Sequence, residues 1–238
     1  MSQQIRISAK HLGQLALADF CPRCFWTRLR CSDKLPFQIF PGIFASFDSF
    51  QKKVTALHHQ KYGTAPKWLD GFGELGEPLP IPHHSVFQTL HIATNILVTG
   101  VPDELFRRKD GSLVILDNKT ARFTKNQDVL LPLYVIQLNG YAWISERLGM
   151  GAVSGLGLVY YEPMTELTTE TIDTVLADDG FSMRFQAKVL PLNLQLDHIP
   201  PLLQKVRAIF DLATAPIGRD GCKDCRLLDG LLKTVMNN

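Results

Sequence analysis

The sequence predicts an α/β protein whose two ends meet at a four-cysteine site. Strand-like runs flank Asp110-Gly111, a pair typical of a tight hairpin turn. Residues 133–148 carry apolar side chains at helical spacing and are followed by Gly149, a common helix end. Two Cys-x-x-Cys pairs, one near each end of the chain, complete the pattern.

The N-terminal part of the chain is predicted to be mostly helical. Ser8 is a good N-cap for a helix over residues 9–19, which leads to the first cysteine pair. A second helix is expected over residues 46–62, stopped by Gly63. Its apolar residues at helical spacing predict a core-facing stripe; they are Phe47, Phe50, Val54 and Leu57. A loop rich in Gly and Pro follows.

Strands dominate the middle of the chain and one more helix closes it. We expect a strand over residues 86–92 that leads into the hairpin at residues 96–120. Two further strands are expected at residues 155–161 and 181–190. The last predicted helix begins at Pro200-Pro201 and ends near Pro216, just before the second cysteine pair.

Composition narrows the class of protein. The chain has 238 residues, 45% of them hydrophobic and 20% charged, which suits one well-buried globular domain. A net charge of +2 does not by itself indicate a polyanionic partner, so nucleic-acid binding would depend on local basic clusters such as residues 107–109. No run is long enough to span a membrane and the start lacks the apolar core of a signal peptide, so we expect a cytoplasmic protein without membrane contact.

Three charged residues interrupt the apolar pattern of the hairpin. Alternate residues of a strand share a face, so Asp117 and Lys119 point the same way, Asn118 points the other way, and Asp103 lies on the neighbouring strand. Two carboxylates and an amine suit phosphodiester hydrolysis assisted by Mg²⁺ or Mn²⁺. Each motif alone is common by chance, and Asp103 after Pro102 also fits a simple turn.

Polar residues on two helices are further candidates. Gln137 and Tyr141 are four residues apart, so an amide and a phenol share one helix face and can reach the same object. Asp48 lies near the start of the second predicted helix. An acid is favoured there by the helix dipole, so a structural role suffices for it.

The four paired cysteines predict a metal centre. Cys21, Cys24, Cys222 and Cys225 supply the four thiolates that zinc or an iron–sulfur cluster takes. A site built from them would tie the ends of the chain together. The alternative is four unrelated buried cysteines, which the matched spacing disfavours. Cys31 is expected to be a small buried apolar residue.

The ordered motifs resemble the PD-(D/E)xK nuclease superfamily, in particular its RecB-like branch of CRISPR-associated iron–sulfur exonucleases. The resemblance is carried by Gly100-Val-Pro-Asp103, Asp117-Asn-Lys119 and Gln137-Leu-Asn-Gly-Tyr141 and covers most of the chain. It implies a restriction-endonuclease-like core, a central mixed β-sheet flanked by helices, within one domain over residues 1–238. It also implies that Asp103 and Asp117 bind metal, that Lys119 is catalytic, and that the helix motif contacts DNA or the active site.

The resemblance extends to the cysteines and to Asp48. It implies a 4Fe-4S cluster with Cys21 as the leading ligand and Cys222 and Cys225 as trailing ligands. The third trailing cysteine of the family would fall near Leu231, so Cys24 would replace it, and four thiolates accept zinc equally well. Residues 1–35 and 215–238 would form this region, and residues 40–190 the nuclease core. Asp48 would take the place of a His or Glu that relatives use as an additional metal ligand.

The expected function is a metal-dependent DNA nuclease acting on single strands or free ends, in repair, recombination or CRISPR adaptation. A second reading is a non-catalytic DNA-binding or scaffold protein that keeps the nuclease fold as the partner of a helicase or integrase. A third reading is a structural protein held together by zinc. Metal-dependent cleavage of DNA distinguishes the first from the other two.

Overall fold

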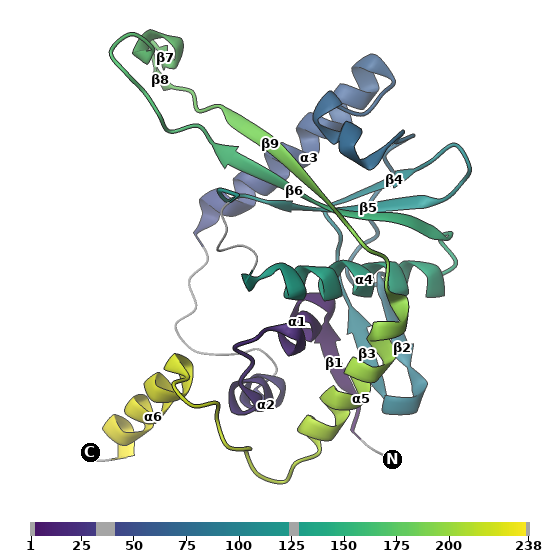
Figure 1. Cartoon of the computed structure of the whole chain (residues 1–238), viewed down its shortest axis with the longest axis vertical. Coiled ribbons are helices and arrows are strands. Elements are labelled where there is room, and N and C mark those ends of the chain that lie inside the picture. The colour runs from purple at the N-terminus through teal and green to yellow at the C-terminus, as the bar shows by residue number, and fades with distance from the viewer. Residues whose placement is uncertain (1–2, 32–40, 124–128, 237–238) are drawn as a thin grey trace.

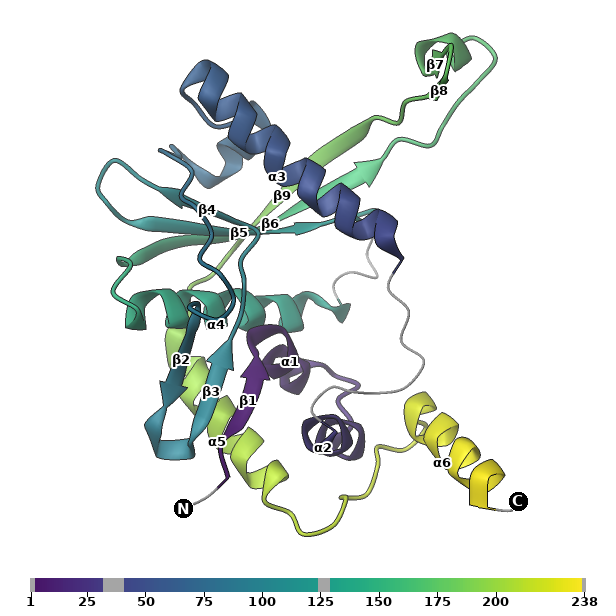
Figure 2. The same ribbon diagram turned by 180° about the vertical axis from the view of Figure 1, so that it is seen from behind.

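The computed structural model describes residues 3–31, 41–123 and 129–236 and has mixed sheets and helices. A four-stranded sheet in the order β4-β5-β6-β9 has α3 on one face and α4 on the other (Figures 1 and 2). The β5-β6 pair is parallel and the two flanking pairs are antiparallel. Its elements are α3 (Gly42–Tyr62), β4 (Glu104–Arg107), β5 (Leu113–Lys119), α4 (Leu131–Arg147), β6 (Val153–Pro163) and β9 (Phe185–Leu192).

The predicted hairpin is formed by β4 and β5. The backbone N–H of Arg108 donates to the carbonyl of Ser112 at 2.8 Å, and Gly111 has a φ of +85°, which glycine adopts without strain. The hairpin is shorter than predicted, because residues 96–99 form β3 (Ile96–Thr99) in another sheet. Pro102 has no N–H to donate and lies in the irregular segment between β3 and β4.

A second, three-stranded sheet lies on the far side of α4. Its order is β1-β3-β2, with β1 (Ile5–Ser8) parallel to β3 and β2 (Gln88–His91) antiparallel to it. The single central sheet expected for the core is therefore divided into two in this structure. The main hydrophobic core lies between them, around the buried residues of α4.

Helix α1 (Ala9–Gly13) packs directly on α4. A Cβ added at Gly140 would lie 2.7 Å from the Cβ of Ala9, so the two helices meet at a glycine. Ser8 caps α1 as predicted, since its Oγ accepts from the N–H of His11 at 3.1 Å. The helix is shorter than the predicted residues 9–19 and continues as a 3₁₀ turn, Gln14–Ala16.

The predicted apolar stripe of α3 is only partly a core face, because Phe47 packs against the cluster on this side of the sheet and Val54 is half-buried. Phe50 and Leu57 are 62% and 60% exposed, whereas Gln51 and Thr55 are the buried residues of this helix. The helix turns a polar face toward the hairpin because buried polar groups there meet hydrogen-bonding partners. Gly63 ends the helix in the left-handed region, at a φ of 70°, as expected.

Strands β6 and β9 extend beyond the sheet and carry a small arm. The arm ends in β7 (Leu176–Ala177) and β8 (Gly180–Phe181), so the strand predicted at residues 181–190 is two strands (Figure 1).

The C-terminal segment of the chain, with helices α5 and α6, packs near its N-terminal segment. Helix α5 (Ile199–Phe210) ends earlier than the predicted Pro216. It is followed by α6 (Lys223–Met236), which was not predicted and which begins within the second cysteine pair. The region around α6 lies beside α2 (Pro22–Arg30), as both views show (Figures 1 and 2). Residues 32–35 of the predicted cysteine region lie outside the described residues. Among the described helices, none is long and apolar enough to cross a membrane.

Candidate active site and cysteine centre

The two predicted carboxylates are joined through the backbone of β5. Asp103 lies just before β4, and its Oδ2 accepts a hydrogen bond from the N–H of Asn118 at 2.8 Å. Asn118 is the residue between Asp117 and Lys119, so the D-x-K strand itself holds the first acid of the motif. The structure therefore places Asp103 beside Asp117 and Lys119, although Asp103 is not on a strand.

Asp117 is the most deeply buried charged group of this cluster. It is 3% exposed, and burial raises the pKa of its carboxyl to about 6 although Lys119 attracts the ionised form. Its Oδ1 accepts from Gln137 Nε2 at 3.0 Å. Its Oδ2 accepts no hydrogen bond of good geometry but is in ion-pair contact with Lys119 Nζ, which lies 4.2 Å from the ring of Tyr134.

The helix motif of α4 reaches this cluster. Gln137 Nε2 also donates to the hydroxyl oxygen of Tyr141 at 2.7 Å, so the amide bridges the phenol and Asp117. Burial raises the pKa of Tyr141 and keeps the phenol neutral. The ring lies against Gly100, where an added Cβ would be 2.6 Å from Cδ1 and closer still to Cε1. Gly100, the first residue of the predicted motif, thus leaves room for the ring of Tyr141, its last residue.

Asp48 joins the cluster through a lysine that the sequence reading did not single out. The Nζ of Lys52 is 2.8 Å from Asp48 Oδ2 and 2.9 Å from Asp103 Oδ1. Burial alone would lower the pKa of Lys52, but the hydrogen bond with Asp48 and the attraction of Asp103 outweigh it and raise the pKa. The i,i+4 spacing of an acid and a lysine was the signal available in the sequence.

Glu104 is a second residue that the sequence reading missed. Its Oε1 accepts from Thr55 Oγ1 at 3.2 Å and from Asn118 Nδ2 at 3.0 Å, on the side of the sheet facing α3. Burial raises its pKa to about 7, although these hydrogen bonds oppose the shift. The expectation that Asn118 points away from Asp117 and Lys119 is consistent with this contact. An acid beside Leu105 and Phe106 was the signal.

The four paired cysteines converge as predicted. All four Sγ atoms lie within 4.8 Å of one another, and they could hold a metal ion. The Sγ atoms of Cys21 and Cys24 each lie 3.5 Å from that of Cys225, and the Sγ of Cys24 lies 3.6 Å from that of Cys222. Cys31 is exposed, so the expectation that it would be buried was wrong.

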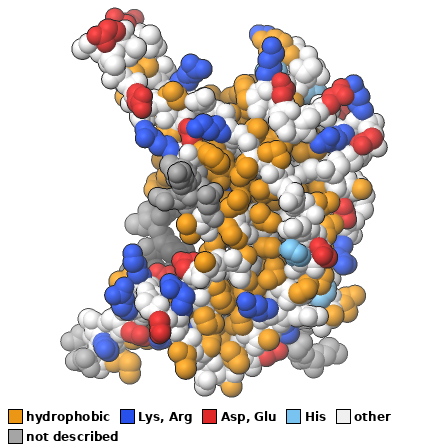
Figure 3. Space-filling model, in the orientation of Figure 1, with side chains coloured by type: hydrophobic (Ala, Val, Ile, Leu, Met, Phe, Trp, Pro, Cys, Tyr) orange, Lys and Arg blue, Asp and Glu red, His pale blue; other side chains and the backbone are white. Residues whose placement is uncertain are grey.

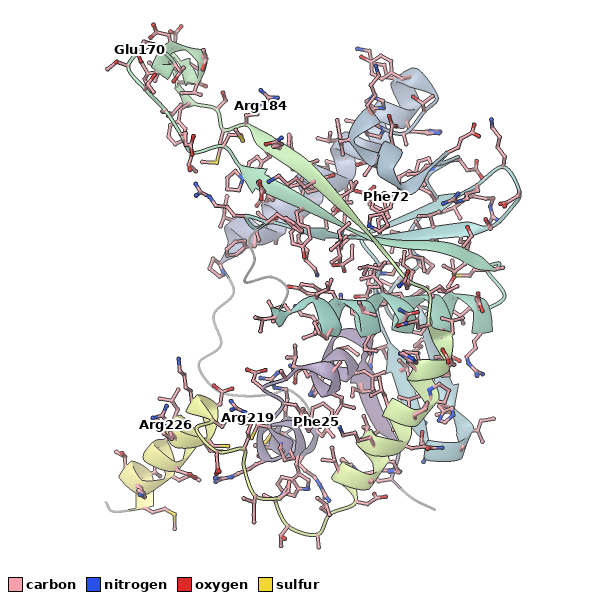
Figure 4. All side chains as sticks on the ribbon, in the orientation of Figure 1. Phe25, Phe72, Glu170, Arg184, Arg219 and Arg226 are labelled. Atoms are coloured by element: carbon pink, nitrogen blue, oxygen red, sulfur yellow. The ribbon has the colours of Figure 1, made fainter. Side chains whose placement is uncertain are left out.

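The surroundings of the cysteines stabilise charge on one thiol in particular. Burial raises the pKa of Cys21, but hydrogen bonds from the backbone, including Arg219 N–H at 3.3 Å, lower it to about 6. Burial raises the pKa of Cys225 to about 11. Arg23 and Asp229 form a bidentate pair at 3.1 and 2.5 Å that ties α2 to α6. Phe25 and Arg219, which are labelled next to each other by α2 in Figure 4, line a cavity together with Cys21, Cys24 and Cys222.

The two groups of side chains suit different metals. Carboxylate oxygens are the ligands that Mg²⁺ and Mn²⁺ prefer, whereas four thiolates suit zinc or iron. Among the described residues, the cysteines are the set of three or more ligand atoms that converges on one point. Asp48, Asp103 and Asp117 do not converge in this way, because lysine ammonium groups lie between or beside them.

Comparison with known proteins adds little to this geometry. No family model and no curated protein matches the chain. Among solved structures it is similar to one described as "Crystal structure of SSO0001", at 15% identity over 91% of this chain and 80% of that one, with a TM-score of 0.39.

Proposed function

We propose that the chain is a divalent-metal-dependent deoxyribonuclease of the PD-(D/E)xK type that acts on single strands or free ends. One observation carries the proposal. Hydrogen bonds and an ion pair connect all five side chains of the motif, from Asp103 through the backbone of β5 to Asp117 and Lys119, and on to Gln137 and Tyr141. These links join residues 103 to 141 across the segment before β4, strand β5 and helix α4, which chance similarity of short motifs does not explain.

Each residue has a role that its contacts support. Asp103 and Asp117 offer oxygen ligands, and a divalent ion held there would activate water and neutralise charge on the scissile phosphate. Lys119, in ion-pair contact with Asp117, would orient the attacking water or stabilise negative charge as it develops. Gln137 fixes the orientation of the Asp117 carboxylate, and Tyr141 fixes that of Gln137.

Basic side chains elsewhere support a nucleic-acid substrate. Lys and Arg side chains gather over the region of α2 and α6 with some acidic side chains among them, and further acidic side chains lie at the tip of the arm (Figure 3). Arg219 and Arg226 belong to this basic group, and Arg184 lies on the arm where it leaves the sheet (Figure 4). A strand of DNA contacting these groups would gain affinity through its phosphates without sequence preference.

We also propose that the cysteine centre holds a single ion, zinc, in tetrahedral coordination. With Zn–S bonds of about 2.3 Å, the edges of a regular tetrahedron are about 3.8 Å long. The observed sulfur separations, from 3.5 Å up to the 4.8 Å limit of the set, bracket that value. A cluster of four irons would lie between the thiolates and hold them farther apart. A colourless protein with one zinc per chain is expected; a brown protein with four irons would contradict this.

The nuclease proposal is tested with Asp117→Asn. The variant keeps the shape of the side chain but removes a charged oxygen ligand, so Mn²⁺-dependent cleavage of single-stranded DNA is expected to fall by roughly 10²-fold or more. Asp110→Asn is the matched control, because Asn-Gly suits the same exposed turn and should leave the rate unchanged. Tight DNA binding without cleavage by the unaltered protein would instead favour a non-catalytic role.

A further inference from the structure

We propose that Lys52 takes the place of a second metal ion in this site, so that the chain binds one divalent cation and the Lys52 ammonium supplies the other positive charge. The inference deepens the proposed nuclease function and rests on it. It concerns a residue outside the recognised motif.

The position of the Lys52 ammonium carries the proposal. Its Nζ lies 2.8 Å from an oxygen of Asp48 and 2.9 Å from an oxygen of Asp103, so it bridges two of the three acids expected to bind metal. An ion bound between Asp48 and Asp103 would have to displace this ammonium. The other oxygen of Asp103 accepts from the N–H of Asn118 at 2.8 Å and keeps a second lone-pair direction for a ligand bond.

Helix geometry alone does not account for the bridge. An i,i+4 pair on a helix brings Lys52 to Asp48 and is only weakly stabilising when exposed. The contact with Asp103 is different, because Asp103 comes from the segment before β4 and its side chain is only 18% exposed. Lys52 thus links α3 to the segment before β4, where Asp103 lies.

The balance of charge in the site agrees with one metal ion. Four carboxylates, those of Asp48, Asp103, Asp117 and Glu104, and three ammonium groups, those of Lys10, Lys52 and Lys119, interact in or beside the site. When all are ionised they leave one net negative charge. One divalent ion and one phosphodiester bring the site to neutrality, whereas two divalent ions would leave two excess positive charges. Asp117 Oδ2 is buried and accepts no hydrogen bond, so we place the single cation at this oxygen, beside the ammonium of Lys119.

The test counts bound Mn²⁺ by electron paramagnetic resonance in the full chain, with the cysteine centre first loaded with zinc. We expect one Mn²⁺ per chain in the unaltered protein and two in Lys52→Met, whose similar length removes the charge without shortening the side chain. Lys53→Met is the matched control, since Lys53 is the exposed neighbour on the same helix, and it should still bind one. Lys52→Arg should also bind one, because the charge is kept. Circular dichroism checks that each variant is folded.

The number of bound ions shows whether the role of Lys52 fails alone or together with the nuclease proposal. Two Mn²⁺ ions in the unaltered protein, or one in Lys52→Met, would overturn the role of Lys52 while leaving the nuclease proposal in place. No bound Mn²⁺ in the unaltered protein, or binding that survives Asp117→Asn undiminished, would overturn both. As a second readout, the dependence of the cleavage rate on Mn²⁺ concentration should change from first order to second order in Lys52→Met.

Discussion

Gly100→Ala tests whether the contact between Gly100 and Tyr141 shapes the site. The new Cβ would lie 2.6 Å from Cδ1 of a ring that is 5% exposed, and closer to Cε1. Ordinary carbon contacts are about 3.5–4.0 Å, so the ring must move by roughly 1 Å. Overpacking of this kind costs about 1–3 kcal/mol, which corresponds to a fall in Tm of roughly 2–12 °C for a chain of this length.

The same displacement should impair the proposed nuclease activity. Tyr141 accepts a hydrogen bond from Gln137, which in turn holds Asp117, so moving the ring moves the chain of groups that orients the carboxylate. A shift of this size can cost roughly 10²-fold in rate. Calorimetry measures the loss of stability, and Mn²⁺-dependent cleavage per folded molecule measures the loss of rate.

Gly157→Ala is the matched control for this prediction. Its Cβ would lie 2.9 Å from Cδ1 of Phe72, and closer to Cε1, in the hydrophobic cluster on the α3 side of the sheet. It should lower Tm at least as much but leave the cleavage rate per folded molecule intact. In a Tyr141→Ala background, Gly100→Ala should cost almost nothing. An equal cost in both backgrounds would refute the steric argument.

Three further predictions address other parts of the molecule. Glu104→Gln should stabilise the protein by up to about 3 kcal/mol at pH 8 and by less than about 1 kcal/mol at pH 5. The pKa of Glu104 rises from 4.5 to about 7 on folding, so ionising the buried carboxyl costs stability as pH rises through that window. Equal gains in the free energy of urea unfolding at both pH values would contradict this. Cys225→Ser should lose bound metal and lower Tm by several degrees, whereas exposed Cys31→Ser should change neither, as elemental analysis and calorimetry will show. Gln137→Leu removes the N–H donor to Asp117. Because that hydrogen bond favours the ionised carboxylate, its loss should raise the pKa of Asp117 and weaken Mn²⁺ binding more at pH 6 than at pH 8. An unchanged Mn²⁺ affinity in calorimetry at both pH values would argue against that hydrogen bond.

Local signals in the sequence predicted the turn and the helix ends well. Asp110-Gly111 fixes the β4-β5 turn because glycine accepts the positive φ at that position, and Gly63 and Gly149 end their helices for the same reason. These features depend on the chemistry of a few adjacent residues. The cysteine centre was also predictable, since two pairs of thiols have few other reasons for matched spacing.

Features that depend on tertiary packing were not predictable. Phe50 and Leu57 have helical spacing, but which face of α3 meets the sheet is decided by the hydrogen bonds of Gln51 and Thr55, which come from outside the helix. Likewise, the sequence shows no sign that β3 leaves the hairpin for another sheet.

The sequence predicted which residues form the candidate site but not the contacts between them. The motif residues were recognisable by their order along the chain, and the structure brings them together. Lys52 and Glu104 were missed because an isolated lysine on a helix and an acid in a strand usually have structural explanations. Their importance is visible only once Asp103 and Asn118 are placed beside them.

The most direct test of the nuclease assignment is Lys119→Met, assayed by Mn²⁺-dependent cleavage of end-labelled single-stranded DNA. Lys109→Met is the control, because Lys109 is an exposed lysine near the hairpin turn. The assignment predicts a loss of roughly 10²–10³-fold in rate for Lys119→Met, with DNA binding retained, and no loss for Lys109→Met. Equal cleavage by the Lys119→Met variant and the unaltered protein would contradict it.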